Sequence, residues 1–404
     1  MFNILRINGH EAWILSENEH IFAICTEIVI KMDTITHFDR EKPFNQLPKL
    51  PPSQEIIDKE VLIEWGLASR NLAALNKNLQ RLPDPLMLVN TISLREAKSS
   101  SEIENIFTTD DELYKAISET IREEQATGAA KEVLRYREAL WTGFYNMKET
   151  GSITLETLVK VFQQVKNASQ RIRSPQSKIV IRRGNSEFRS GEVIYTPPRG
   201  EGVVKELLEN LVTYLSGNDS DSTDPLIKMA ISHYQFEAIH PFTDGNGRAG
   251  RILNLLYLVN QGLLTLPVLY LSKYIIENKA DYYYRLGTVS QRGDWKAWLI
   301  YMMRAVSYTS AYTNRLIDEI LEQMDATLEY TKARLTWYNK EVNELLFRQP
   351  YFKPALLNQV LNRTSRTTLT KYMNELIGLG IISPKRDGKE VYYLNIDLIR
   401  ILED

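Results

Sequence analysis

The hydrophobic residues of this chain mostly recur at intervals of three and four, the spacing that places them on one face of an α-helix. In residues 154–165, for example, Leu155, Leu158, Val159 and Phe162 follow this spacing. The same kind of pattern predicts further helices at 68–79, 112–147, 203–216, 225–239, 252–259, 272–278, 280–290 and 316–337, with others beginning at Gln54 and Asp294. The chain is therefore predicted to be mainly α-helical.

Two short stretches depart from the helical spacing. Residues 178–182 and 193–196 are rich in β-branched residues, a Gly-Asn-Ser turn lies between them, and two prolines follow the second stretch. This order predicts a β-hairpin inserted into a helical domain. Near the start of the chain, residues 12–15 and 21–25 are candidates for short strands, whereas the proline-rich residues 47–52 are expected to lie extended on a surface.

The last part of the chain combines three predicted helices with two predicted strands. The helices are expected at 341–348, 353–361 and 365–379, with Ser365 as a cap, and the strands at 381–384 and 390–394. This order resembles a winged helix, in which residues 365–371 would enter a DNA groove. From Glu341 onward, however, nine Lys/Arg face eight Asp/Glu, and a net charge of +1 is weak for a phosphate-binding face. Protein docking or dimerisation is therefore favoured over DNA binding.

The composition indicates a protein with a substantial core and no membrane span. The 404 residues suggest two or three domains; 43% are apolar and 25% charged, and a net charge of −2 gives no general attraction to nucleic acid or membranes. The single cysteine, Cys25, excludes an intramolecular disulfide. The most apolar region, residues 252–271, contains Asn, Gln, Gly and Pro, which predicts core rather than a membrane span. Since no secretory leader pattern is present, we expect a cytoplasmic protein.

Reactive and phosphate-binding side chains are concentrated in residues 240–251, which read His-Pro-Phe-Thr-Asp-Gly-Asn-Gly-Arg-Ala-Gly-Arg. His240 precedes a proline, which predicts the end of a helix, and the glycine-rich loop opens into the next helix. Unpaired N–H groups at such a helix start bind anions, and Arg248 and Arg251 can add guanidinium contacts to phosphates. Asp244 is a hard oxygen ligand suited to Mg²⁺ carried on a nucleotide. His240 can accept a proton near neutral pH.

This stretch resembles the signature of Fic-domain enzymes: His-Pro-Phe, a variable residue, Asp/Glu-Gly-Asn-Gly-Arg, two variable residues and Arg. Every specified position is present. The resemblance implies a Fic-type helical bundle whose β-hairpin is the flap that holds a target segment beside the active site. It also implies that ATP is the substrate and that its phosphates lie over the loop and helix start, at Gly245, Asn246, Gly247, Arg248, Ala249, Gly250 and Arg251.

The resemblance assigns roles to individual side chains. His240 would accept the proton of a target Ser, Thr or Tyr hydroxyl, and Asp244 would hold the magnesium ion. Asn246 and the loop amides would stabilise charge at the α-phosphoryl group, with Arg248 on the β-phosphate. The result would be AMP attached to a protein hydroxyl.

The helix predicted at 280–290 is implied to lie near the adenine. Family members keep a tyrosine-rich helix at this place, and Tyr283 is the best candidate for the contact. Tyr282, Tyr284 and Asn278 are alternatives, and aromatic packing accounts equally well for any single tyrosine.

A second family motif is found upstream of the signature. Ser100, three further residues and Glu104-Asn105 resemble the inhibitory motif Ser/Thr-x-x-x-Glu-Gly/Asn. In the family this glutamate pairs with the second signature arginine, here Arg251, at the position needed by the γ-phosphate of ATP, because carboxylate and phosphate compete for one guanidinium. Without the resemblance, a serine before glutamates is typical of a helix N-terminus, and Glu104 would be a solvated side chain.

The predicted hairpin has two interpretations. An exposed strand edge can bind an extended peptide by main-chain pairing, which makes Val193, Ile194, Tyr195 and Thr196 the candidate target-binding residues. Without the family resemblance, the hairpin would be a short cover over the core.

Five regions are predicted: an N-terminal segment of uncertain fold (1–42), a helical region with the inhibitory motif (43–151), the Fic core (152–310), a linker helix (311–340) and a winged-helix-like module (341–404). The predicted function is transfer of AMP from ATP to target proteins, restrained by Glu104. Self-modification and a homodimer are also considered, and DNA is the least favoured partner. Two alternatives stay open. In the first, the same site removes AMP from modified proteins or transfers another phosphate-containing group. In the second, the chain is a DNA-binding regulator with a nucleotide-sensing core.

Overall fold

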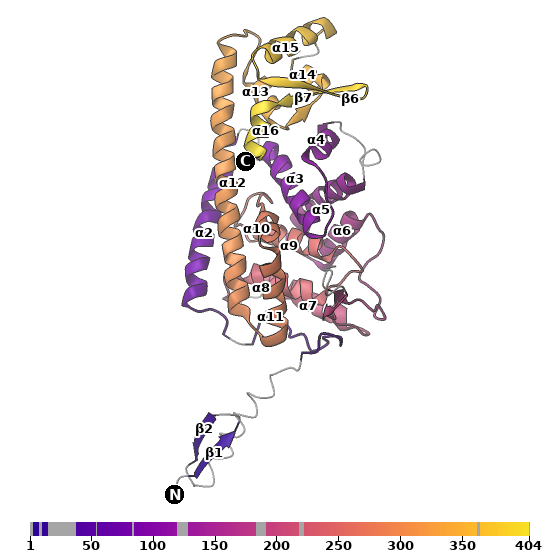
Figure 1. Ribbon diagram of the computed structural model, residues 1–404, viewed down its shortest axis with the longest axis vertical. Coiled ribbons are helices and arrows are strands. Elements are labelled where there is room, and N and C mark those ends of the chain that lie inside the picture. Colours follow the sequence, from indigo (N-terminus) through magenta and orange to yellow (C-terminus); the bar gives the residue numbers. More distant parts are fainter. Residues whose placement is uncertain are drawn as a thin grey trace.

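The computed structural model describes residues 3–7, 10–14, 38–53, 55–82, 85–118, 128–182, 191–217, 222–361 and 364–403 (Figure 1). The described part of the chain is mainly helical, with short strands in three small sheets, which confirms the predicted fold class. Within these ranges, no helix combines the length and the hydrophobicity that crossing a membrane requires.

Two long helices form one side of the molecule. α2 (Lys59–Leu79) and α12 (Trp295–Lys332) lie side by side (Figure 1). Polar contacts advance along both helices together, which shows that they run parallel: Lys296–Asp58, Asn71–Ser307 and Arg81–Asp318.

The boundaries of these two helices correct the sequence prediction. Helices were expected to begin at Gln54 and to span 68–79, but one helix begins after Asp58, whose carboxylate accepts the N–H groups of the first turn; Gln54 itself lies outside the described residues. The core helix expected from Asp294 and the linker helix at 316–337 are one helix of 38 residues. No Gly or Pro interrupts it, so the predicted boundary between 310 and 311 falls inside a continuous helix.

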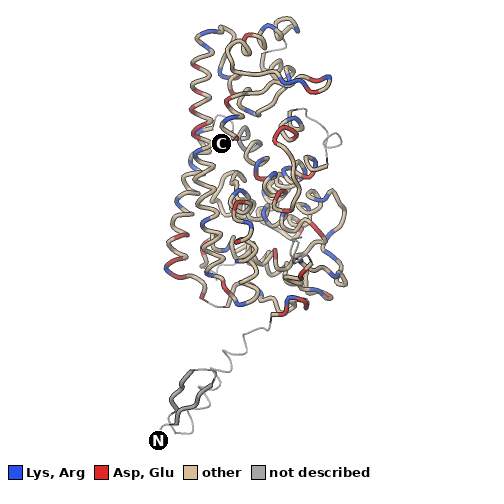
Figure 2. Tube along the Cα trace, in the orientation of Figure 1, with Lys and Arg blue, Asp and Glu red and all other residues tan. Residues whose placement is uncertain are grey.

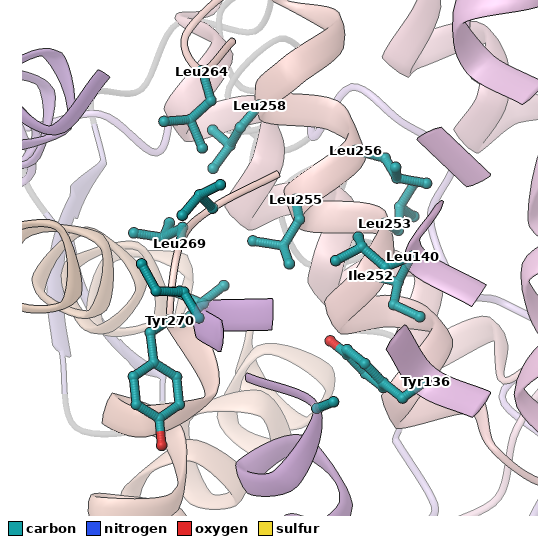
Figure 3. Close-up of a cluster of buried hydrophobic side chains, with 14 of the residues drawn as sticks. Tyr136, Leu140, Ile252, Leu253, Leu255, Leu256, Leu258, Leu264, Leu269 and Tyr270 are labelled. Carbon is teal, nitrogen blue, oxygen red and sulfur yellow. The ribbon is translucent and has the colours of Figure 1, made fainter. Parts of the chain in front are cut away.

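The centre of the molecule is built around α8 (Pro225–Ile239) and α9 (Asn246–Asn260), which are buried on all sides. Leu253 and Leu256 of α9 point toward α5, whereas Leu255 and Leu258 point toward the segment that follows α9 (Figure 3). The surrounding helices are α5 (Gly128–Thr150), α6 (Leu155–Lys166), α7 (Val203–Ser216), α10 (Leu271–Glu277) and α11 (Lys279–Arg292). The loop that joins α8 to α9 is therefore held between two fully packed helices.

Helix α3 (Pro85–Ile103) is attached to the core by a buried carboxylate. Oε1 of Glu96 accepts hydrogen bonds from Tyr136 (3.0 Å) and from the Ser272 hydroxyl (2.5 Å), and Oε2 accepts the Ser272 N–H (2.8 Å). Burial raises the pKa of Glu96 although these donors lower it. Glu96 thus ties α3 to both α5 and α10.

The C-terminal module contains three helices, an antiparallel sheet of order β5–β7–β6 and a last helix. Its elements are α13 (Lys340–Phe347), β5 (Tyr351–Phe352), α14 (Pro354–Val360), α15 (Arg366–Gly378), β6 (Ile382–Asp387), β7 (Glu390–Asn395) and α16 (Ile396–Glu403). The predicted helices, strands and Ser365 cap are confirmed, and Ser365 accepts the N–H of Thr368. β5 and α16 were not predicted; β5, with two residues, is too short to show a pattern.

The module docks on α4 (Asp110–Ser118) through charged groups. Asp111 accepts hydrogen bonds from Lys385 (2.6 Å) and Tyr351 (3.0 Å), and Lys115 pairs with Asp387 at 2.7 Å. Partial burial alone would raise the pKa of Asp111, but these donors together with Lys115 lower it to about 2. Elsewhere on the module, Lys and Arg are interspersed with Asp and Glu (Figure 2), in keeping with its small net charge.

The predicted hairpin is found with changed boundaries, whereas the strand pair near the N-terminus differs from the expectation. β3 (Ile181–Arg182) and β4 (Val193–Tyr195) form the hairpin inserted after α6, and the turn between them lies outside the described residues. Near the N-terminus, β2 (His10–Ile14) covers most of the strand expected at 12–15, but it pairs with β1 (Asn3–Ile7), which was not predicted. The second expected strand, 21–25, lies outside the described residues.

Gly143 on α5 marks a close approach between helices and gives a test of the packing. A Cβ atom there would lie 2.5 Å from Leu256 Cδ1 and 2.8 Å from Val161 Cγ2, so we expect Gly143→Ala to destabilise the protein by about 1–3 kcal/mol. A Cβ atom on Gly66 of α2 would meet nothing within 4 Å, so Gly66→Ala should stabilise by up to about 1 kcal/mol through helix propensity. Urea unfolding followed by circular dichroism measures both. Equal effects of the two substitutions would contradict the close packing of α5 against α9.

Candidate active site

His240 ends α8 in an unusual backbone conformation. Its φ of 49° and ψ of 60° lie in the left-handed region, which non-glycine residues rarely adopt. The residue after it is proline, so the chain leaves the helix and turns back, as the sequence predicted. This turn places His240 at the entrance of the loop that leads to α9.

Asn246 holds the loop closed. Its Oδ1 accepts the N–H of Phe242 (2.8 Å), and its Nδ2 donates to the carbonyl of Phe242 (2.9 Å). The ring of Phe242 stacks on Phe162 with centroids 4.0 Å apart. The side chain of Asn246 was expected to face a phosphate; in the structure both of its polar atoms brace the loop, which leaves the backbone N–H and the second Nδ2 hydrogen for that role.

Arg173 is a residue of this site that sequence reasoning missed. Its backbone N–H donates to the Pro241 carbonyl (3.0 Å), Nε donates to the His240 carbonyl (2.8 Å), and Nη2 reaches the carbonyls of Ile239 and Pro198. One side chain thus fixes the His240 turn and the segment after the β3–β4 hairpin. Arg173 lies 67 positions before His240 in an irregular segment, so no local pattern marks it.

The surroundings of His240 favour its neutral form. Burial and, to a lesser degree, the positive charge of Arg173 lower the pKa of the imidazole to about 4, against smaller opposing effects of the Glu237 backbone, Glu104 and Asp244. A neutral imidazole at physiological pH is able to accept a proton. His233, two turns earlier on α8, is different: it is fully buried and hydrogen-bonded to Tyr282, so it serves the packing of the core.

The start of α9 has the geometry of an anion site. Gly245 adopts a φ of 74° as the N-cap, and no side chain caps the first turn, so backbone N–H groups point outward beside Asp244. Partial burial would raise the pKa of Asp244, but Lys166, at 2.7 Å, and the N–H of Gly245 lower it. Asp244 is therefore an ionised, exposed carboxylate.

One such carboxylate fits a magnesium ion whose other ligands are nucleotide oxygens and water. Within the part of the chain that the structure describes, no group of three or more His, Cys, Asp or Glu side chains is placed to hold a metal by itself.

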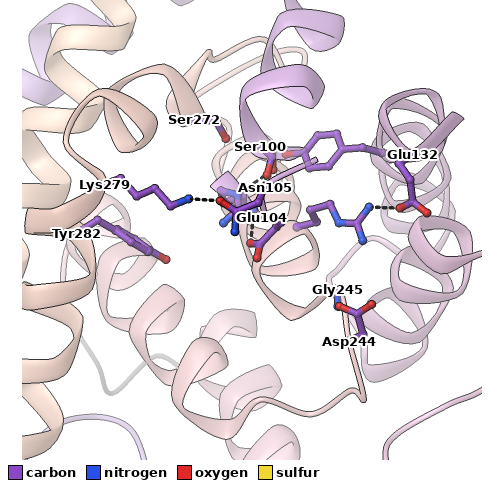
Figure 4. A network of polar contacts seen from close by, with 12 residues as sticks. Ser100, Glu104, Asn105, Glu132, Asp244, Gly245, Ser272, Lys279 and Tyr282 are labelled. Atoms are coloured by element: carbon purple, nitrogen blue, oxygen red, sulfur yellow. Dashed lines mark hydrogen bonds and ion pairs between the residues drawn. The ribbon is translucent and has the colours of Figure 1, made fainter. Parts of the chain in front are cut away.

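Arg251 contacts both Ser100 and Glu104, which lie close together in Figure 4, and the pairing with Glu104 is the one that the family resemblance implied. Arg251, with 1% of its side chain exposed, donates from Nε to the Ser100 hydroxyl (2.7 Å) and from Nη2 to the Ser100 carbonyl and Glu104 Oε1 (both 2.8 Å). Ser100 lies inside α3 and not at a helix N-terminus. Glu104 follows the last turn of α3, and Asn105, with a φ of 62°, turns the chain away.

Two glycines of α9 leave room for neighbouring carboxylates. A Cβ on Gly247 would lie 2.2 Å from Glu104 Oε1, and a Cβ on Gly250 would lie 2.4 Å from Glu237 Oε1. Any larger residue at position 247 would displace Glu104 from Arg251. Between the two glycines, Ala249 packs into the core with 2% exposure.

The first signature arginine also has a carboxylate partner. Nη1 of Arg248 donates to Glu132 on α5, and 2% of the Arg248 side chain is exposed. Glu132 was not among the predicted site residues, because a glutamate in a charged helix carries no sequence signal.

The tyrosines of α11 differ in exposure. Tyr282 is 1% exposed and belongs to the core, whereas Tyr283 is 40% exposed. Burial and the negative charge of Glu104 raise the pKa of Tyr283, so the Tyr283 hydroxyl lies within electrostatic range of Glu104. Tyr284 is 56% exposed and accepts a hydrogen bond from Arg292. Of the three, Tyr283 alone combines exposure with proximity to the site.

The four predicted target-binding residues of the hairpin are not equivalent. Val193 and Ile194 are half-buried, but Tyr195 and Thr196 are buried. Tyr195 donates to the Ala238 carbonyl (2.9 Å), and the Thr196 carbonyl accepts the N–H of Phe44 (3.0 Å). The side chains of Tyr195 and Thr196 therefore serve the fold, and residues of the chain itself cover part of the edge that was expected to be exposed.

Comparisons with known proteins agree with this geometry. The Fic/DOC family N-terminal model matches residues 62–145, the Fic/DOC family model matches 152–258, and the model of the C-terminal domain of SoFic-like protein adenylyltransferases matches 320–398. Together they cover about two thirds of the chain. The chain belongs to the Fic/DOC family. Within it, the match of the last part is to SoFic-like proteins.

Relatives named protein adenylyltransferases match shorter stretches. Protein adenylyltransferase fic-1 of Caenorhabditis elegans is 32% identical over 152 residues, which are 37% of this chain and 27% of the relative. A probable protein adenylyltransferase of Aquifex aeolicus is 44% identical over 73 residues, 18% of this chain and 22% of the relative. The chain thus spans about a quarter of the length of these relatives.

Solved structures share the fold. A Fic family protein from Desulfovibrio desulfuricans G20 aligns with a TM-score of 0.53 and 22% identity, over 85% of this chain and 98% of that one. A Fic domain containing signaling protein from Bacteroides thetaiotaomicron aligns with a TM-score of 0.50 and 18% identity, over 62% of this chain and 95% of that one. Both confirm the fold class.

The low pKa of His240 can be tested directly. Because burial and Arg173 disfavour the protonated ring, the imidazole should stay neutral from pH 8 down to about pH 5 and should protonate only as the pH falls through about 4. Nitrogen-15 NMR of the histidine rings, assigned with His240→Gln, measures this titration. A midpoint near the ordinary value of about 6.5 would contradict the described environment.

Proposed function

We propose that this chain is a protein adenylyltransferase, which transfers AMP from ATP to a Ser, Thr or Tyr hydroxyl of a protein. The observation that carries the proposal is the juxtaposition of a neutral His240 with the uncapped start of α9 and its two buried arginines. A proton acceptor beside a polyphosphate cradle supports attack of a hydroxyl on a phosphoryl group. The names of the similar proteins support ATP as the donor and AMP as the transferred group.

In the proposed reaction, the target hydroxyl approaches His240, and the imidazole accepts its proton. The hydroxyl oxygen forms a bond to the α-phosphorus. At the same time, the bond between the α-phosphorus and the oxygen that bridges the α- and β-phosphates breaks, so pyrophosphate leaves in line with the attacking oxygen. Backbone N–H groups of Asn246 and Gly247 stabilise the charge that develops on the α-phosphoryl oxygens, and Arg248 binds the β-phosphate. A magnesium ion, held by Asp244 and the phosphates, would neutralise charge on the leaving group.

The β3–β4 hairpin is proposed to position the target segment. Val193 and Ile194 remain available for this role, because Tyr195 and Thr196 are used by the fold. Main-chain pairing with a short strand would give register without a strict requirement on the target sequence.

Glu104 is proposed to restrain the reaction. It occupies the Nη2 group of Arg251 at 2.8 Å, and Gly247 lies directly beside it. A γ-phosphate that approached Arg251 would have to displace this carboxylate. Without that contact, the triphosphate is held less firmly in the orientation for in-line attack.

The proposal predicts opposite effects of two substitutions. Glu104→Gly should raise the rate of AMP transfer at least about tenfold, because it frees Arg251 for the γ-phosphate, whereas adding His240→Ala should remove the activity, a loss of about a hundredfold or more. The measurement uses ATP labelled at the α-phosphate, with magnesium and cell extract as a source of targets, followed by gel and mass spectrometry.

Glu102→Gly is the matched control, since Glu102 lies on α3 and pairs with Lys98 instead of Arg251. It should leave the rate near that of the wild type. AMP transfer that persists in the Glu104→Gly, His240→Ala variant would refute His240 as the base. Loss of AMP from modified proteins in place of its transfer would favour the hydrolase alternative.

A further inference from the structure

The two signature arginines are both buried, and each has its own carboxylate from a different helix. Arg251 meets Glu104 just beyond the end of α3, and Arg248 meets Glu132 of α5. A buried guanidinium needs such a partner, because an uncompensated charge in the interior is strongly unfavourable. The two pairs differ, however, in what each arginine can still offer to a ligand.

Two of the three nitrogens of the Arg251 guanidinium already have partners while Glu104 is bound. Its Nε is taken by the Ser100 hydroxyl, and its Nη2 is shared between the Ser100 carbonyl and Glu104. Arg248 is different. It meets Glu132 through Nη1, and its buried Nε has no hydrogen-bond partner among the described residues. A buried donor without a partner is rare in proteins, and here it lies one helical turn from the uncapped start of α9.

Glu132 is itself held in place. Its second oxygen, Oε1, lies 3.6 Å from Nη1 of Arg135, one turn further along α5. In Figure 4, Glu132 lies on the side of the network opposite Lys279 and Tyr282, and Glu104 lies between Glu132 and these two residues. The carboxylate therefore approaches Arg248 from its own side of the site and bridges two arginines.

We infer that Glu132 is a positioning residue for the polyphosphate site. By accepting a hydrogen bond from Nη1, Glu132 fixes the plane of the Arg248 guanidinium and leaves Nε to donate to an oxygen of the β-phosphate. The inference rests on the proposed function for the identity of the ligand. Glu132 would thus support the binding of nucleotides that carry a β-phosphate and would not affect those that lack one.

A competing carboxylate would behave in the opposite way. If Glu132 occupied the phosphate position, as Glu104 is proposed to do at Arg251, its removal would tighten nucleotide binding. The unpartnered Nε argues against this, because Arg248 retains a donor without releasing Glu132.

The test is isothermal titration of the full chain with ATP, ADP and AMP in the presence of magnesium, in the Glu104→Gly background so that Arg251 is free. Glu132→Gln should weaken ATP and ADP binding about tenfold, as outer-shell substitutions do, and leave AMP binding within about twofold. Glu132→Asp, which keeps the charge, should restore part of the affinity for ATP and ADP. Glu138→Gln is the matched control: Glu138 lies on α5, 52% exposed, and pairs with Arg137.

Three results would overturn the inference. Tighter ATP binding in Glu132→Gln would make Glu132 a competitor of phosphate. Equal weakening of all three nucleotides would indicate general disruption of α5, and unchanged affinities would leave Arg248 independent of Glu132. A chain that shows the expected differences in binding but transfers no AMP would contradict the proposed function and leave the role of Glu132 intact.

Discussion

Neutralising two buried guanidinium groups on one helix is the constraint around which this structure is arranged. Arg248 and Arg251 sit on α9, which is buried on all sides, so their charges cannot be screened by water. Counter-charges have to come from elements that pack against α9: α5 supplies Glu132, and the end of α3 supplies Glu104. The same two helices therefore support the core and set the electrostatics of the site.

Around this charged centre, hydrogen bonds from the side chains of Arg173 and Asn246 to the loop backbone fix the loop between α8 and α9. His240 adopts a backbone conformation that is unfavourable for a residue with a Cβ atom; Arg173 binds its carbonyl, and Asn246 fixes Phe242 two residues further on. The imidazole is positioned by backbone geometry more than by partners of its ring. Burial then keeps the ring neutral.

Most of this arrangement was predictable where a local pattern exists. Helical spacing located α6, α7 and α8 to within a residue, and the signature and inhibitory motifs brought Glu104 to Arg251. Prediction was poorer where tertiary context decides. The helix break expected near residue 310 had no Gly or Pro to support it, and α12 continues through this point where it lies along α2 (Figure 1).

The residues that the sequence analysis missed, two in the site and one in the fold, share one property. Arg173, Glu132 and Glu96 act through partners far away in sequence, so neither spacing nor composition distinguishes them from ordinary surface charges. Asn246 shows the converse: the motif identified the residue, but its side chain turned out to close the loop.

The C-terminal module is joined to the rest of the molecule by two routes. One is covalent, through α12; the other runs through Asp111 and Lys115 on α4 and through Arg95 on α3, which donates to the Leu402 carbonyl across 307 positions of sequence. A chain that ended before α13 would lack the module and, with it, the polar contacts that the module makes with α3 and α4. A deletion or a bulky tag at the C-terminus therefore changes the surroundings of α3, the helix that leads to Glu104. Its phenotype would reflect the state of Glu104 as well as the loss of the module.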